Sequence, residues 1–220
     1  MISAPNDERS YSRYNQYGDN PMAPVGPIGM IPLKGSVAFS EQVNYYLNKR
    51  RMEYQQEQFI SKYPGFLRSD YSISVDTPRF SSGEGKAVVQ SSVRGHDLYI
   101  LADVMNSSCT YKLFGQDNRM SPDDHYQDLK RVIAAIGGKA RRVNVIMPYL
   151  YEGRQSKRIG RESLDCANAL HELIDMGVEN IITFDAHDSR VQNATPLHGF
   201  ETVQPSYQFI KALLNHEKGL

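Results

Sequence analysis

Four cationic side chains stand close together in the segment PYLYEGRQSKRIGRES, directly after an apolar run that ends at Met147. Within eight residues the segment contains Arg154, Lys157, Arg158 and Arg161. Because arginine donates two parallel hydrogen bonds to phosphate oxygens, this concentration of cations suits a triphosphate. A solvated loop has the same composition, so the residues alone leave both interpretations open.

A carboxylate and an imidazole follow a later apolar run, in the segment DAHD. Asp185 and His187 lie two residues apart, so their side chains project to the same side of an extended backbone. Such a pair can hold a metal ion, position a water molecule or act as acid and base. The alternative is that Asp188 caps a turn or a helix and that His187 is an ordinary hydrogen-bonded histidine.

Two earlier segments carry further candidate ligand-binding side chains. In RFSSGE, Gly83 allows a tight turn, and Phe80 could stack on a base if it is exposed, although phenylalanine is usually buried. In SVRG, the Ser92 hydroxyl and the Arg94 guanidinium could share one anion. An ordinary turn is the more common explanation of a segment such as SVRG.

Strands and helices alternate along most of the chain, and their order indicates where these segments lie. Apolar and alternating runs predict strands at residues 71–75, 87–89, 97–104, 143–147 and 181–184. Helical spacing predicts helices after Ser40, at 121–136, at 164–174 and at 207–214. This order predicts an α/β fold with a mostly parallel sheet flanked by helices. In such sheets ligands bind beyond the carboxyl ends of the strands, and the cationic segment and DAHD both follow predicted strands.

Composition divides the chain into two parts. Residues 1–30 are polar and turn-rich without a helical or strand period, which predicts a flexible N-terminal arm. Residues 31–220 are predicted to form one domain. Within that domain Ser121, Pro122 and the acidic pair Asp123-Asp124 have the pattern of a capped helix start.

Composition also excludes several classes of protein. The net charge is zero, from 25 basic and 25 acidic residues, so no overall electrostatic attraction favours nucleic acid. The longest apolar runs, such as residues 98–102, are far shorter than the roughly 18 residues of a membrane helix. Two cysteines are too few for a disulfide framework, which indicates reduced thiols in a cytoplasmic protein. One of them, Cys166, falls in a predicted helix among packing residues, so it is not expected to be a nucleophile.

Several catalytic motifs are missing from the sequence. It contains no GxxxxGK[ST] loop, no GxGxxG, no GxSxG elbow, no CxxC pair and no HExxH. These absences argue against a Walker-type ATPase, a serine hydrolase of the elbow type and a zincin metalloprotease.

Six sequence blocks occur in an order that resembles the N-terminal half of the ribose-phosphate pyrophosphokinase (phosphoribosyl pyrophosphate synthase) family. The blocks are RFSSGEG, SVRGHDLYIL, DDHYQDLKRVIAA, RRVNVIMPYLYEGRQSKR, GRESLDCANAL and GVENIITFDAHDSRVQN. The resemblance runs from about Gly35 to Leu214 and is especially close to a variant branch of the family. It implies a type I phosphoribosyltransferase-like fold. It also implies transfer of pyrophosphate from Mg-ATP to ribose 5-phosphate, which gives phosphoribosyl pyrophosphate and AMP for nucleotide biosynthesis.

The resemblance assigns ATP-binding roles to residues of two segments. Arg154 and Gln155 match residues that hold ATP, with Arg154 against the adenine, and the cations Lys157 and Arg158 continue the same loop. Phe80 and Glu84 match the part of a neighbouring subunit that closes over the base. The split site implies a homo-oligomer that assembles through this domain.

The resemblance also assigns a metal site and a regulatory site. His187 matches the family's metal-binding histidine, and Asp185 stands with it, so Mg²⁺ is the implied ion. Ser92 and Arg94 match a phosphate or ADP regulatory site of the classical branch.

Two departures from the classical pattern affect the residues assigned to the adenine contacts. The loop reads RQSKRIGRE instead of roughly RQDRKARSRE, so that Ser156 replaces an acidic residue. Ser82 stands where the family has Asp or Asn against the base.

The family's later motif, in which two acidic residues and a Gly-rich loop bind ribose 5-phosphate, has no counterpart in this chain. The pair Asp123-Asp124 is better explained by helix capping, and the lysine and arginine of the family's later catalytic loop are also missing. We therefore expect that the family's C-terminal domain is absent, that no catalytic residue lies in this part, and that the isolated chain is inactive. The alternative is a non-catalytic regulatory or scaffold subunit that associates with full-length synthase. A generic nucleotide-binding sheet domain would explain the strand order but not six ordered blocks.

Overall fold

Five parallel strands form the central sheet of the computed structural model, which describes residues 25–56 and 65–217. In spatial order they are β1 (Ile28–Pro32), β4 (Asp97–Leu101), β7 (Arg142–Met147), β8 (Asn180–Phe184) and β9 (Gly199–Val203). This arrangement confirms the predicted α/β class and parallel sheet. Residues 1–24 of the predicted arm lie outside the described residues, and Ile28–Met30, counted with the arm, belong to β1.

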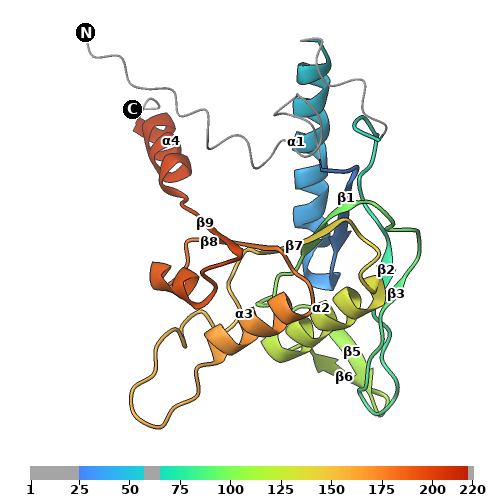
Figure 1. The fold of residues 1–220 in the computed structure, drawn as a ribbon, viewed down its shortest axis with the longest axis vertical. Coiled ribbons are helices and arrows are strands. Elements are labelled where there is room, and N and C mark those ends of the chain that lie inside the picture. Colours follow the sequence, from blue (N-terminus) through green and yellow to red (C-terminus); the bar gives the residue numbers. More distant parts are fainter. Residues whose placement is uncertain (1–24, 57–64, 218–220) are drawn as a thin grey trace.

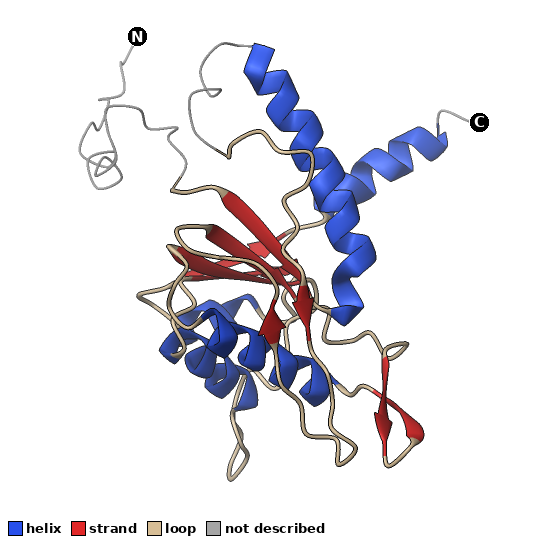
Figure 2. Cartoon of the chain, turned by 90° about the vertical axis from the view of Figure 1, so that its right-hand side faces the viewer, coloured by secondary structure: helices blue, strands red, loops and turns tan. Residues whose placement is uncertain are grey.

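Helices lie on both sides of the sheet. Figure 2 shows α2 (Pro122–Ile136) and α3 (Asp165–Asp175) together beneath the strands, whereas α1 (Val37–Gln56) and α4 (Ser206–Glu217) rise on the other side. The larger core lies between the sheet and the α2–α3 layer and includes the fully buried Leu98, Ile100 and Val145. A smaller core beneath α1 is centred on Met30, Tyr71 and Leu101. In Figure 1, α4 stands apart from α1 and follows directly from β9.

The remaining elements are short. They are β2 (Val75–Asp76), β3 (Val88–Val89), β5 (Thr110–Leu113), β6 (Gln116–Arg119) and the 3₁₀ turns η2 (Lys34–Ser36) and η3 (Ser189–Ala194). β2 pairs with β3, and β5 pairs with β6, in two small antiparallel ribbons. None of the helices in the described part combines the length and the apolar composition of a membrane span.

The start of α2 confirms that the acidic pair lies in the first turn of a helix and that Asp124 caps it. The Ser121 hydroxyl accepts a hydrogen bond from the Asp124 amide at 3.1 Å, and the Asp124 carboxylate accepts one from the Ser121 amide at 2.9 Å. This reciprocal capping box satisfies two amides that the first turn leaves without helical partners. At the other end Gly137 adopts a left-handed backbone with φ 59°, which ends the helix where the sequence predicted.

Several predicted boundaries are wrong, and four strands were missed. Residues 71–74 do not form a regular strand: the segment pairs with β1 only around Met30, which donates to the Tyr71 carbonyl at 2.8 Å. The predicted strand 97–104 ends at Leu101, and α1 begins at Val37, before Ser40. The β5–β6 ribbon was also missed. β1 and β9 escaped prediction because β1 carries Gly29 and Pro32 and because β9 is only half buried.

A buried polar network crosses the amino edge of the sheet. The Asp97 carboxylate accepts two hydrogen bonds from the Arg142 guanidinium, at 2.7 and 2.6 Å, and one from the Asn144 amide at 2.9 Å. Asn144 in turn accepts from Asn180 at 2.6 Å, and Gly199 leaves the space beside Asn180 that a Cβ atom would occupy. The close Asp97 carboxylate raises the pKa of Arg142. The network thus links β4, β7 and β8 at one level and sets their registers.

We predict that Asp97→Asn lowers the free energy of unfolding by about 3 kcal/mol, because it leaves the partly buried Arg142 without its carboxylate. Urea unfolding monitored by circular dichroism measures this change. The control is Asp117→Asn, which removes the partner of Lys112 in a pair whose side chains are both 65% exposed, and which should cost less than about 1 kcal/mol. Equal losses in the two variants would contradict the proposed importance of the network.

Candidate functional site

A pocket of about 320 Å³ opens where β7 and β8 end. Its lining comes from the segment after β7 and from the turn after β8: Tyr149, Leu150, Gly153, Phe184, Asp185, Ala186 and His187. The position agrees with the rule that ligands of open parallel sheets bind beyond the carboxyl ends of the strands. The pocket also includes the carboxylate and imidazole that the sequence singled out.

The turn that carries this pair is held in an uncommon conformation. Asp185 has φ 46°, in the left-handed region that residues other than glycine seldom adopt. Its amide donates to the Val203 carbonyl at 3.0 Å, and the Ala186 amide donates to the Thr202 hydroxyl oxygen at 3.0 Å. Both acceptors lie on β9, so the neighbouring strand supports the strained backbone.

Asp188 anchors the other end of the turn. Its carboxylate accepts from the Arg190 amide at 2.9 Å, as the cap of η3, and pairs with the Arg190 guanidinium at 2.6 Å. These contacts hold the pKa of Asp188 well below its usual range, and the charge of Lys157 adds to the effect. The alternative interpretation of Asp188 as a cap is therefore confirmed, and the cationic loop lies near the turn.

Asp185 and His187, by contrast, are exposed, and neither side chain has a hydrogen-bond or ion-pair partner among the residues that the structure describes. Within residues 25–56 and 65–217 no three His, Cys, Asp or Glu side chains gather as a protein-only metal site requires. The pair therefore offers one carboxylate and one imidazole, and any bound ion needs further ligands. Magnesium commonly takes such ligands from water and substrate phosphates.

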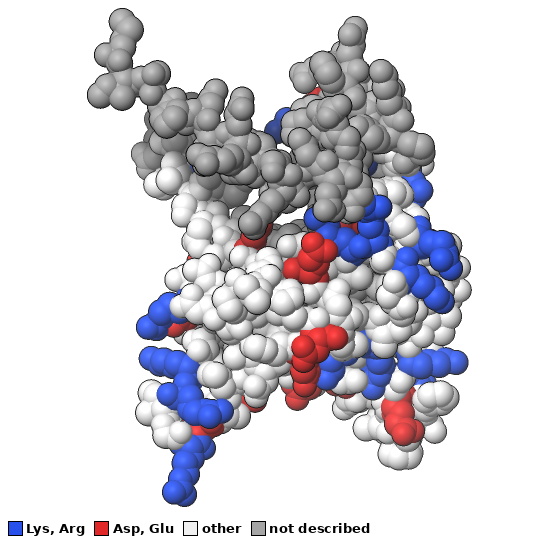
Figure 3. Space-filling model, viewed as in Figure 1, with Lys and Arg blue, Asp and Glu red and all other residues white. Residues whose placement is uncertain are grey.

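The cationic segment after β7 projects from the body of the protein. Figure 3 shows Lys and Arg side chains along this projection at the lower left, where Figure 1 places the loop between β7 and α3. Arg154 is exposed and lines a smaller cavity beside the first, together with Tyr149 and Tyr151. Glu152, two residues earlier, has a left-handed backbone with φ 54°. The loop thus brings cations to the same edge of the sheet as Asp185 and His187.

Gln155 is engaged within the protein. Its side-chain oxygen accepts from the Asp165 amide at 3.2 Å, and its amide nitrogen donates to the Lys157 carbonyl at 3.3 Å. Leu164, the residue before α3, has no capping side chain, so Gln155 serves as a cap from ten residues away. Lys157 and Arg158 are both exposed.

Phe80 and Glu84 lie on a different part of the surface. They belong to a tight turn between β2 and β3, in which the Phe80 amide donates to the Glu84 carbonyl at 2.7 Å. Phe80 is 54% exposed, and Glu84 accepts from the Ser82 hydroxyl at 2.8 Å. Figure 1 places the β2–β3 segment at the right and the β7–α3 loop at the left, with α2 between them. Within one chain, the structure does not bring Phe80 to Arg154.

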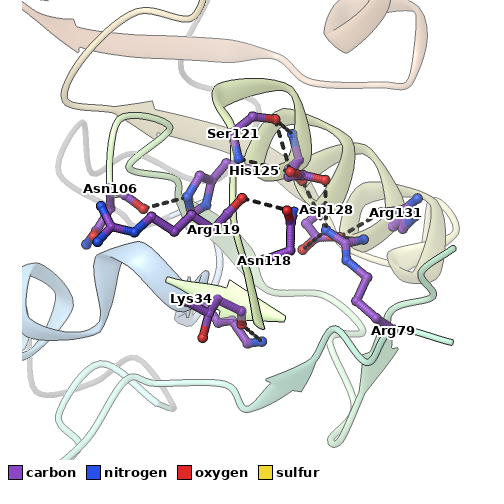
Figure 4. Close-up of polar contacts among 11 residues, drawn as sticks. Lys34, Arg79, Asn106, Asn118, Arg119, Ser121, His125, Asp128 and Arg131 are labelled. Atoms are coloured by element: carbon purple, nitrogen blue, oxygen red, sulfur yellow. Dashed lines mark hydrogen bonds and ion pairs between the residues drawn. The ribbon is translucent and has the colours of Figure 1, made fainter. Parts of the chain in front are cut away.

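A buried ion pair attaches this turn to α2. Figure 4 shows Arg79 reaching the Asp128 carboxylate, with contacts of 2.7 and 3.0 Å, while Arg131 approaches the same carboxylate at 2.8 Å. The Arg79 and Asp128 side chains are each only 5% exposed. The guanidinium of Arg79 also lies over the Tyr111 ring of the β5–β6 ribbon. The turn that carries the exposed Phe80 is therefore held against α2 by this buried ion pair.

Ser92 and Arg94 lie at the opposite edge of the sheet from the pocket. They are exposed in the turn before β4, where the Arg94 amide donates to the Ser92 hydroxyl at 3.4 Å. The Gly95 amide donates to the Lys139 carbonyl at 3.3 Å, which joins this turn to the one before β7. Any anion bound there would be remote from the pocket.

Sequence reasoning missed several residues of the site. Tyr149 and Phe184 form walls of the pocket, and Thr202 supports the turn. Their positions directly after β7 and at the end of β8 could have identified the two walls, but β9 was not predicted, so nothing identified Thr202. Burial raises the pKa of the Cys166 thiol to about 11, which agrees with a packing role for this residue.

Comparisons with known proteins agree on one family. A family model described as the N-terminal domain of ribose phosphate pyrophosphokinase matches residues 33–177. Ribose-phosphate pyrophosphokinase 1 of Schizosaccharomyces pombe is 32% identical over 135 residues, which are 60% of this chain and 29% of that protein. Putative ribose-phosphate pyrophosphokinase 2 of Streptococcus pneumoniae is 29% identical over 116 residues, which cover 52% of this chain and 32% of that protein.

A solved structure shows the same fold. The crystal structure of phosphoribosylpyrophosphate synthetase from Mycobacterium smegmatis matches with a TM-score of 0.65 at 17% identity. The match covers 86% of this chain and 52% of that one, and it confirms the predicted fold. The aligned parts amount to 29% and 32% of the two curated relatives and to about half of the solved chain.

Proposed function

Because this chain belongs to the family of ribose phosphate pyrophosphokinase N-terminal domains, we propose that it carries the ATP-side half of such a site. The complete reaction would transfer pyrophosphate from Mg-ATP to ribose 5-phosphate in nucleotide biosynthesis. The observation that carries the proposal is the pairing of two features at one edge of the sheet. These are the turn that exposes Asp185 and His187, and the cationic loop beside it.

A triphosphate would bridge these two features. Arg154, Lys157 and Arg158 would neutralise phosphate oxygens from one side, as guanidinium and ammonium groups do in other phosphate sites. Asp185 and His187 would face the phosphates from the other side through a bound cation. The exposed cations have the reach for this role because they stand on a projecting loop.

The residues present fit an Mg²⁺ ion that is shared between the protein and the substrate phosphates. They do not fit a structural ion held by the protein alone. Mg²⁺ is usually held by one or two carboxylates together with substrate phosphates and water, and Asp185 provides one carboxylate. His187 adds a nitrogen ligand, which Mg²⁺ prefers less than oxygen. When bound, the ion would reduce the negative charge of the phosphates during transfer.

The base would be held between two copies of the chain. Arg154 would lie against the adenine of its own site, while Phe80 and Glu84 of a neighbouring copy would close over that base. The separation of the β2–β3 turn from the cationic loop within one chain supports this division. Gln155 would act indirectly, because its contacts with Asp165 and Lys157 shape the loop that carries Arg154. We therefore propose a homo-oligomer.

The ribose 5-phosphate site would lie outside these 220 residues, so we propose that the isolated chain does not turn over. We also propose a cytoplasmic location, and anion binding at Ser92 and Arg94 as a regulatory contact. The location rests on the small number of cysteines, and the regulatory contact rests on the resemblance to the classical branch.

One observation favours the second candidate, a non-catalytic partner subunit. Helix α4 exposes more than half of each of five large apolar side chains: Tyr207, Phe209, Ile210, Leu213 and Leu214. Apolar surface of this kind often marks contact with another protein. Such a surface fits an accessory subunit that contacts another protein through α4.

We predict that Arg154→Ala weakens Mg-ATP binding by about 1.5 to 3 kcal/mol, the value of a charge-assisted contact. Isothermal titration calorimetry on the 220-residue chain measures the change. Arg50→Ala is the matched control, because it removes the same charge from an exposed pair with Glu53 on α1 and should leave the affinity unchanged. An unaltered affinity in Arg154→Ala would remove Arg154 from the site.

We further predict that the chain with Mg-ATP and ribose 5-phosphate releases no AMP above the uncatalysed rate. The physical reason is that no acidic-glycine loop is present to hold the sugar phosphate. A coupled AMP assay of the chain alone tests the half-site proposal. The same assay with a full-length synthase added tests the partner subunit. Turnover by the chain alone would contradict the half-site proposal. Altered synthase activity without nucleotide binding by the chain would favour the partner subunit.

A further inference from the structure

The turn carrying Asp185 and His187 takes its shape from the edge strand β9. Asp185 is left-handed at φ 46°, and such a backbone persists in a residue other than glycine only where its surroundings impose it. Two contacts from β9 do so: the Val203 carbonyl accepts from the Asp185 amide, and the Thr202 hydroxyl accepts from the Ala186 amide, both at 3.0 Å.

These two contacts differ in what they require of the sequence. The Val203 contact uses the main chain, so almost any residue can supply it. The Thr202 contact uses a side-chain oxygen, so it depends on a hydroxyl at this position. The register of β8 and β9 pairs Thr183 with Thr202 and Phe184 with Val203, which brings this hydroxyl beside the end of β8.

The far end of the turn has its own anchor in Asp188, which caps η3 and pairs with Arg190. The segment between the anchors contains the two side chains that face the pocket without partners in the described part of the chain. Thr202 is thus the one side chain, among the described residues, that bonds the backbone between Asp185 and His187.

We propose that Thr202 is a positioning residue, whose hydroxyl holds the Ala186 amide and so keeps Asp185 and His187 directed together into the pocket. The role of the pair as the cation-binding end of a nucleotide site rests on the function proposed above. Without the hydroxyl, the Ala186 amide loses its acceptor, and only the Val203 carbonyl still supports the strained backbone at Asp185. The carboxylate and the imidazole then no longer hold a common direction.

Two variants separate the hydroxyl from the shape of the side chain. Thr202→Val keeps the branched shape and the strand propensity but removes the acceptor, whereas Thr202→Ser keeps the acceptor. Calorimetry on the 220-residue chain compares the dissociation constant of Mg-ATP with that of ATP in the presence of EDTA. We expect Thr202→Val to weaken Mg-ATP binding by about threefold to tenfold, the effect of one lost hydrogen bond, and Thr202→Ser to match the wild type. Metal-free ATP should bind all three proteins alike, because the proposed role of Asp185 and His187 is to bind the cation. A general loss of structure in Thr202→Val would instead weaken the binding of both forms of the nucleotide.

A second measurement needs no nucleotide. Amide hydrogen exchange followed by NMR should be faster at Ala186 in Thr202→Val than in the wild type or in Thr202→Ser, while exchange at β7 stays the same. An Ala186 amide that is equally protected in Thr202→Val would overturn the positioning role.

The two experiments also separate this inference from the proposed function. If the wild type binds Mg-ATP and Thr202→Val binds it equally well, the inference fails and the proposed function stands. If the wild type does not bind Mg-ATP, the proposed function fails, and the exchange rate at Ala186 decides the role of Thr202 by itself.

Discussion

At the amino edge of the sheet, the carboxylate of Asp97 neutralises the guanidinium of Arg142 and accepts a hydrogen bond from Asn144, which bonds Asn180 on the next strand. Burying charged and polar groups without their partners costs free energy. The network therefore strongly disfavours other alignments of β4, β7 and β8, in which these partners would be separated. A slip of one residue would also move the apolar side chains of a strand to the wrong face. Because the strands are parallel and in this register, β7 and β8 end side by side. The cationic loop follows β7 and the Asp185–His187 turn follows β8, so both lie at the same edge of the sheet. The binding edge of the protein therefore depends on a network at the opposite edge.

Among the described residues, three residues other than glycine have a left-handed backbone; two of them lie at the edge that carries the pocket, and the third, Phe114, lies in the β5–β6 turn. Asp185 and Glu152 both have left-handed backbones, and each lies in a segment that lines one of the two adjacent cavities. Such conformations cost of order 1 to 3 kcal/mol each, so their presence in the segment after β7 and in the Asp185–His187 turn favours a functional explanation. The exposed Phe80 turn is held differently, by the buried pair of Arg79 and Asp128 on α2. One chain therefore offers an edge with a cationic loop and, on a separate surface, an exposed aromatic side chain on a supported turn.

The elements that sequence reasoning predicted well are those whose signals are local. The capping box at Ser121, the glycine end of α2 and the apolar strands β7 and β8 follow from residues within a few positions of one another. The family was also predicted, from six ordered blocks, and the match over residues 33–177 confirms it. β1 and β9 were missed because polar or turn-forming residues interrupt their apolar pattern. The capping role of Gln155 and the support from Thr202 depend on tertiary contacts, and single-sequence patterns contain no information on those.

We propose that a magnesium-bound triphosphate binds at the carboxyl edge, between the loop after β7 and the turn after β8. Two-dimensional NMR of the ¹⁵N-labelled chain, titrated with Mg²⁺ and a non-hydrolysable ATP analogue, tests it most directly. We expect that, among the described residues, the largest amide shifts occur at 149–158 and 184–188. Largest shifts in the Ser92–Arg94 turn or within the helices α2 and α3, or no shifts at saturating nucleotide, would contradict this binding site.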